Sequence, residues 1–347
     1  MKSIKWLISL LLIIIGCSQP DSGNPVNFTT TVVEGNSTII DAEKDTAIVF
    51  PSFIRTAPDY FLIYEANPQK IIKFNYDGEK LQSFGSEGRG PGEFLSLTNY
   101  WIRKDHYLLY DYNGAKMIRY DFKGSLIDEY SVDISKLTMT VDVLSGSKFV
   151  YPANGTHDSL LAISDLKKGE TVFFGQTIAE RNETSNDMVR DIIERGEVPN
   201  YMKNSVQIGA NGSGIFCFQN TKAILQKYTL EGQLQWERDL KMPMVEGVFE
   251  DFLKENKKGK YITPLTYAYG MHVMENGTAL LLNTTDEKPI TVSWVPNDGH
   301  DIQVVEFPSI VRPSQLPLRF RVVPGQKEIL FANSMEGKIM SAEWPIN

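Results

Sequence analysis

The residues that could carry catalytic or metal chemistry are few in this sequence, and they are scattered. No two of the four histidines have the spacing of metal ligands, and no Gly-x-Ser-x-Gly motif marks a nucleophile. His272 lies in the run Tyr267–Val273, which we expect to form an innermost strand, so it is the one histidine that we single out as a candidate metal ligand. We therefore predict no catalytic residues and no cofactor. The four histidines are His106, His157, His272 and His300.

The second cysteine and the acidic pairs favour structural interpretations. Cys217 lies inside an apolar run and is expected to be a buried, inert thiol. The pairs Glu250–Asp251 and Asp286–Glu287 offer the oxygen ligands that Ca²⁺ prefers, but exposed pairs of this kind are more often solvated charge. The glycine-rich run Gly85–Gly92 could cradle a phosphate, but a strand follows it, where a P-loop continues with Gly-Lys-Ser/Thr into a helix.

A repeat of 46 residues defines the elements that would position these side chains. The copy that starts at Asp59 and the copy that starts at Asp105 align without gaps and share seven identical positions, the last of which is Gly78 and Gly124. A third copy fits 154 residues after the first. Each copy consists of short strands joined by turns that contain Gly, Asn or Asp, which is typical of β-hairpins. Units of four strands with a period in the forties predict the blades of a β-propeller.

The units can be counted as six blades. The sixth has room for only three strands, so Ser37–Asp41 is predicted to supply its outermost strand and to close the ring, because an open edge would invite aggregation. The predicted fold class is therefore an all-β, six-bladed β-propeller over residues 37–347, with a β-sandwich as the alternative. The predicted blades are 49–84, 95–131, 138–175, 205–240, 265–307 and 318–347.

Two segments, 176–204 and 244–263, interrupt the repeat with apolar residues at helical spacing. Both connect the last strand of one blade to the first strand of the next. In a propeller, these connections share one face with the turns between second and third strands. We predict two short helical insertions on that face, which form a rim or lid around a binding surface; the alternative is that they only cap the channel. The candidate binding residues are Arg89, Tyr112, Asn113, Arg190, Phe249 and Phe252.

The first residues have the layout of a secretory signal. Two lysines precede the apolar stretch Trp6–Ile15, which is too short to cross a bilayer as a helix. The tetrad that ends in Cys17 resembles the bacterial lipobox, in which the cysteine is acylated and becomes the mature amino terminus. We predict a lipoprotein signal peptide over residues 1–17 with Cys17 as the lipidation site; an ordinary signal peptide with a chance cysteine is the alternative.

Residues 18–36 are predicted to be a flexible tether, since Ser, Pro, Asp, Gly and Asn dominate the part next to Cys17. Ser18, rather than an aspartate, follows the cysteine, which the lipobox resemblance associates with the outer membrane. The periplasmic and the surface side both stay open. The net charge of −8 and the absence of a basic stripe argue against a nucleic-acid partner.

The segment Gly85–Phe94 resembles the NHL-repeat signature, a glycine-rich turn followed by Gly-Glu-Phe at the start of the next innermost strand. From residue 38 to the end, the chain is similar to the six-bladed, TolB-like or NHL-like propeller lipoproteins of Bacteroides-type bacteria. This resemblance implies the fold but no activity. We predict a non-enzymatic, membrane-anchored cell-envelope protein that binds a protein or glycan partner. The alternative is a hydrolase or lyase that acts over the central channel with bound Zn²⁺ or Ca²⁺.

Overall fold

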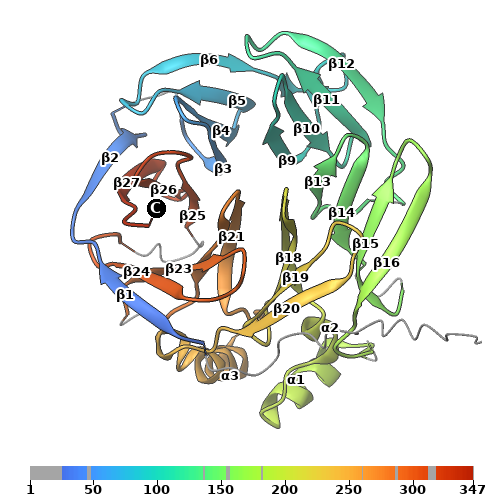
Figure 1. Ribbon diagram of the computed structural model, residues 1–347, viewed down its shortest axis with the longest axis vertical. Helices are drawn as coiled ribbons and strands as arrows, with labels where there is room; N and C mark the ends of the chain where they lie inside the picture. Colours follow the sequence, from blue (N-terminus) through green and yellow to red (C-terminus); the bar gives the residue numbers. More distant parts are fainter. Residues whose placement is uncertain are drawn as a thin grey trace, which may run out of the picture.

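The computed structural model describes residues 26–44, 48–135, 137–153, 157–180, 183–259, 261–285, 288–311 and 318–346. Six sheets of four or five strands stand radially around a central axis (Figure 1). The predicted all-β, six-bladed propeller is therefore confirmed. The predicted signal peptide and Cys17 lie outside the described residues.

The first four blades each consist of four antiparallel strands in chain order, from the axis outwards. The first blade contains β3 (Pro51–Thr56), β4 (Phe61–Ala66), β5 (Gln69–Phe74) and β6 (Lys80–Phe84). The second contains β9 (Leu97–Ile102), β10 (Tyr107–Asp111), β11 (Lys116–Tyr120) and β12 (Leu126–Ser131). The third contains β13 (Asp142–Ser145), β14 (Lys148–Pro152), β15 (Ser159–Asp165) and β16 (Glu170–Gln176). The fourth contains β17 (Val206–Asn211), β18 (Gly214–Gln219), β19 (Ile224–Tyr228) and β20 (Leu234–Asp239).

The last two blades are completed by strands from the amino-terminal part of the chain. The strand β2 (Asn36–Asp41) pairs with the outer side of β27, so the predicted ring closure is confirmed, and its Ile40 is buried. The strand β1 (Phe28–Val32) adds a fifth strand, parallel to β24. The fifth blade contains β21 (Ala268–Met274), β22 (Gly277–Leu282), β23 (Ile290–Pro296) and β24 (Ile302–Phe307); the sixth contains β25 (Arg319–Val322), β26 (Glu328–Asn333) and β27 (Lys338–Glu343).

The strand β1 corrects one part of the sequence prediction, which assigned residues 18–36 to a flexible tether. Residues 28–32 are instead paired along their whole length. All five side chains of β1 are exposed, so the strand is held by backbone hydrogen bonds rather than by burial of an apolar face. The usual alternation of apolar and polar residues is therefore missing from its sequence.

The hydrophobic core lies between neighbouring blades. The second strand of a blade is covered on both sides, and β10, β18 and β22 are buried at every position. Cys217 is one of these residues in β18, fully buried as predicted. Strands that are covered on both sides read as continuous apolar runs, which is why they were easy to locate in the sequence.

The helices in the described part of the chain all lie in two connections between blades. The first connection contains α1 (Asn186–Glu194) and α2 (Asn200–Lys203), and the second contains the 3₁₀ turn η1 (Pro243–Val245) and α3 (Val248–Lys258). Val189 and Ile193 of α1 and Val248 and Phe252 of α3 are buried against the blades. Figure 1 shows the helices together at the rim, outside β16 and β20, rather than over the central channel. No helix in the described ranges is long and apolar enough to cross a bilayer.

Candidate functional site

The direction of the innermost strands defines two faces of the ring. The chain enters each blade at the start of its innermost strand, on one face of the ring. The second strand runs back antiparallel to the first, so the turn between the second and third strands lies on that same face. Both helical connections therefore lie on one face, as predicted. The helices touch directly, since Arg190 of α1 donates hydrogen bonds to the carbonyls of Asn256 (3.4 Å) and Gly259 (3.2 Å) at the end of α3. We call this side, which carries α1 to α3 and the connection 84–97, the helix-bearing face.

A groove of about 340 Å³ opens on the helix-bearing face beside the start of α3. Phe249 is only half-buried in its wall, whereas Phe252 is 5% exposed and belongs to the core. Of these two predicted binding residues, only Phe249 is therefore available to a partner. Other residues that line the groove are Lys241, Met242, Pro243, Glu250 and Tyr267.

The other predicted binding residues do not gather at this groove. Arg190 is used to hold α1 against α3. Arg89 and Asn113 are exposed and Tyr112 is half-buried. They lie in the connection from β6 to β9 and in the turn from β10 to β11, and these strands are across the ring from α3 (Figure 1). The structure thus separates the six residues into an α3 group and a loop group.

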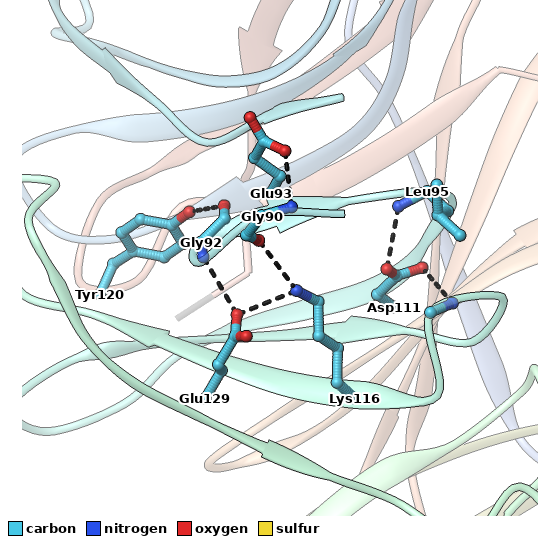
Figure 2. A network of polar contacts seen from close by, with 9 residues as sticks. Gly90, Gly92, Glu93, Leu95, Asp111, Lys116, Tyr120 and Glu129 are labelled. Atoms are coloured by element: carbon cyan, nitrogen blue, oxygen red, sulfur yellow. Dashed lines mark hydrogen bonds and ion pairs between the residues drawn. The ribbon is translucent and has the colours of Figure 1, made fainter. Parts of the chain in front are cut away.

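The glycine-rich loop of the loop group is held by the protein's own side chains (Figure 2). The carboxylate of Glu93 accepts a hydrogen bond from the Gly90 amide (2.7 Å), and a Cβ atom at Gly88 would lie 2.0 Å from the same carboxylate oxygen. The amide of Gly92 donates to Glu129 (3.0 Å). The glycines therefore make room for a carboxylate within the chain, which agrees with the structural interpretation of this run.

Two buried carboxylates with a matching role were missed by the sequence analysis. Asp111, at the end of β10, is fully buried and accepts hydrogen bonds from the amides of Leu95 (2.9 Å), Ser96 (2.9 Å) and Gly114 (3.0 Å). Glu65 occupies the same place in the first blade and accepts from the amides that precede β3. Through these hydrogen bonds, each carboxylate links the turn that follows the second strand of its blade to the segment that leads into the first strand of the same blade. The repeat alignment pairs these two acidic positions, which is the sequence signal that could have located them.

The central channel contains a second cavity, of about 260 Å³. Its lining includes Thr56 and Val273, near the ends of β3 and β21, and Arg103, which follows β9, so it extends into the half of the channel away from the helix-bearing face. His272 lines it, as expected for a residue of an innermost strand. We call it the channel cavity; its polar lining is formed by Arg55, Thr56, Asn99, Arg103, Asp142, His272 and Arg321.

His272 has a structural partner in this cavity. Its Nδ1 atom accepts a hydrogen bond from the amide of Val322 in the next blade (3.1 Å), which requires the neutral ring. Burial, followed by the nearby charges of Arg321 and Arg55, lowers the pKa of His272 well below its usual value. No group of three His, Cys, Asp or Glu side chains that could hold a metal occurs among the residues with described positions.

A belt of hydrogen bonds around the channel crosses all six boundaries between blades. Backbone and side-chain groups both take part, so the innermost strands form a continuous polar ring that fixes the channel lining. The bonds are Arg55 Nε to Tyr100 O, Asn99 Nδ2 to Val141 O, Ala210 N to Asp142 Oδ2, Gln207 Nε2 to Ala268 O, Val322 N to His272 Nδ1 and Thr56 Oγ1 to Val322 O.

Comparison with known proteins supports the fold. A family model described as a 6-bladed beta-propeller, DUF5128, matches residues 40–168. Among solved structures, the chain is similar to a Bacteroides fragilis protein whose name describes it as exported, with 12% identity and a TM-score of 0.56 over 91% of this chain and 99% of that one. A DUF4221 family member from Bacteroides vulgatus is 10% identical, with a TM-score of 0.58 over 90% of this chain and 96% of that one. No curated protein matches the sequence.

Identities of this size show the fold alone, and the resemblance to TolB-like and NHL-like propellers stays a prediction. The strand order, the ring closure and the matching family model agree on the architecture. The chain is a six-bladed β-propeller, closed by its own amino-terminal strand, and its structural neighbours include propellers of Bacteroides.

Proposed function

We propose that this protein is a non-enzymatic binding protein of the cell envelope, anchored by a lipid on Cys17, whose protein or glycan partner binds on the helix-bearing face. The observation that carries this proposal is the groove beside α3, with the half-exposed ring of Phe249 in its wall. Aromatic side chains are strong anchors for partners because they bury a large apolar area at a small entropic cost. Lys241 and Glu250 add charged hydrogen-bonding groups at the same opening.

The entry point of the chain favours a groove close to the membrane. Val26, the first described residue, packs on the hydrophobic cluster that contains Val248 and Phe252 of α3. Between Cys17 and Val26 the chain can extend by about 3.3–3.6 Å per residue, or roughly 30 Å in total. A lipid on Cys17 would therefore hold the groove within a few nanometres of the bilayer, where envelope partners are concentrated.

Point substitution tests the proposal better than deletion of the helices, because Val189 and Ile193 of α1 are part of the core. We expect Phe249→Ala in the mature lipoprotein to weaken binding to envelope proteins or glycan fragments by about 10- to 30-fold, as for a typical aromatic anchor. Tyr130→Ala is the matched control, since Tyr130 is an aromatic residue, 40% exposed, on the outer strand β12. Equal affinities of the Phe249→Ala variant and the parent for every partner would refute the groove as the site.

The anchor is tested separately. Cys17→Ser should abolish incorporation of labelled fatty acid and should move the protein out of the membrane fraction. Retention of the label in this variant would contradict lipidation at Cys17.

A further inference from the structure

The channel cavity brings together positive charge from three neighbouring blades, because Arg55, Arg103 and Arg321 all line it. Arg55 lies on β3 of the first blade and Arg321 on β25 of the sixth, and both line the cavity. Arg319 lies two residues before Arg321 and so points to the same side of the strand. The surroundings lower the pKa of Arg321 well below its usual value, first through burial and then through the charge of Arg55. Arg55 and Arg321 therefore place like charges at the same cavity.

Asp142 is the single carboxylate among the described residues of the cavity lining, and it offsets this positive charge only in part. Asp142 accepts hydrogen bonds from the indole nitrogen of Trp101 (2.6 Å) and from the amides of Val143 (2.8 Å) and Ala210 (2.8 Å). Its oxygens are therefore committed to joining the second, third and fourth blades. Burial also raises the pKa of Asp142, which disfavours its charged form.

Arg55 and Arg321 differ in how many of their N–H donors form hydrogen bonds within the protein. Arg55 donates to the carbonyls of Tyr100 and Ile54 and to the side chain of Asn99. In the described parts of the chain, the one recorded acceptor for Arg321 is the carbonyl of the adjacent Phe320 (2.7 Å). A guanidinium carries five N–H donors, so most of the donors of Arg321 remain for a ligand.

We propose that the channel cavity is a binding site for a small organic anion, whose carboxylate or phosphate group is held by Arg321 and Arg55. Both groups match the planar fork of a guanidinium, and a desolvated cluster of like charges is relieved when such a group binds. Trp101 and Met271 supply apolar surface for the body of the ligand, and Thr56 lies at the same opening. The volume of about 260 Å³ accommodates a single sugar ring with its charged substituent.

This site goes beyond the partner binding proposed above, since it extends into the half of the channel away from the helix-bearing face. The experiment is calorimetry on the mature lipoprotein in detergent, with glucuronate as the carboxylate probe, glucose 1-phosphate as the phosphate probe and glucose as the neutral control. We expect one or both anions to bind with a stoichiometry near one, and binding to weaken as chloride is raised. Tighter binding of glucuronate would identify the ligand's charged group as a carboxylate, and tighter binding of glucose 1-phosphate would identify it as a phosphate. The absence of binding by both anions, or equal binding of glucose, would overturn the proposal.

Variants distinguish a ligand site from a structural role. Arg321→Met should weaken anion binding by at least about tenfold, the contribution of a charge-assisted hydrogen bond. Without ligand, the same variant should melt at or above the temperature of the parent, because a charge that is only partly offset has been removed from the channel. Loss of folding would mark the arginine as structural and refute the proposal.

Arg321→Lys provides a second test, since it keeps the charge but loses the fork. It should fold and bind the anion several-fold more weakly, and unchanged affinity would count against the site. Arg195→Ala, at an exposed arginine directly after α1, is the control that should leave anion binding unchanged.

Discussion

The buried carboxylate of Asp111 offers a test of how the loops of the helix-bearing face are held. In Asp111→Asn, an amide nitrogen replaces one of the two oxygens that accept hydrogen bonds from Leu95, Ser96 and Gly114. At least one backbone N–H then faces another donor in a place without water, because Asp111 is fully buried. The lost charge-assisted bond contributes about 1.5–3 kcal/mol and the unpaired buried donor about 1–3 kcal/mol, partly offset by removal of a buried charge. We expect the free energy of unfolding to fall by about 2–4 kcal/mol.

The measurement is urea-induced unfolding at pH 7, followed by circular dichroism, with Asp121→Asn as the control. Asp121 also accepts hydrogen bonds from two backbone amides, those of Lys123 (2.9 Å) and Ser125 (2.8 Å), but in an exposed turn where water replaces them. The control should therefore lose less than about 1 kcal/mol. Equal effects of the two substitutions would show that burial of the Asp111 carboxylate does not matter, and would refute this account of the loops.

Three further predictions concern the channel, the core and the ring closure. His272 is neutral in the folded protein, whereas in the unfolded chain it has the usual histidine pKa of about 6.5. Below that pH the unfolded state binds one more proton than the folded state, so the free energy of unfolding should fall by up to about 1.4 kcal/mol per pH unit towards pH 5. His272→Asn, whose side-chain oxygen can replace Nδ1, should flatten this pH dependence, whereas His157→Asn at an exposed position should not. Burial raises the pKa of the Cys217 thiol, so mass spectrometry should detect alkylation of Cys217 only after unfolding; rapid labelling of the native protein would contradict its burial. Ile40→Ala in the closing strand β2 should lower the free energy of unfolding, measured by chemical denaturation, by about 2–5 kcal/mol. Thr38→Ala at an exposed position of the same strand should have little effect. Similar small losses in both variants would argue against closure of the ring by β2.

The blades could be predicted because the residues that define them act locally. Gly78 and Gly124 occupy the same turn in the first two blades, with φ angles of +85° and +75° that favour glycine. A side chain at either position would also collide with a neighbouring strand, since the added Cβ would lie 2.6 Å from the Ile39 carbonyl or 2.9 Å from Phe84 Cβ. Steric requirements of this kind recur with the repeat and can be read without a structure.

The candidate sites were harder to predict because they depend on contacts between distant blades. Arg55, Asp142 and Arg321 come from three different blades, and the alternation along a strand does not say which side faces the axis. The helical spacing in 244–263 located α3 correctly, but it could not separate the half-exposed Phe249 from the buried Phe252. That distinction depends on the blades against which the helix packs.

Photocrosslinking in living cells tests the central claim, partner binding beside α3, most directly. A photoreactive phenylalanine analogue would replace Phe249 in one strain and the control residue Tyr130 in another. Tyr130 belongs to β12, which lies across the ring from α3 (Figure 1). We predict a discrete envelope adduct from position 249 and none from position 130. Identical adducts from both positions, or no adduct from position 249 together with unchanged partner affinity of Phe249→Ala, would contradict binding at the groove.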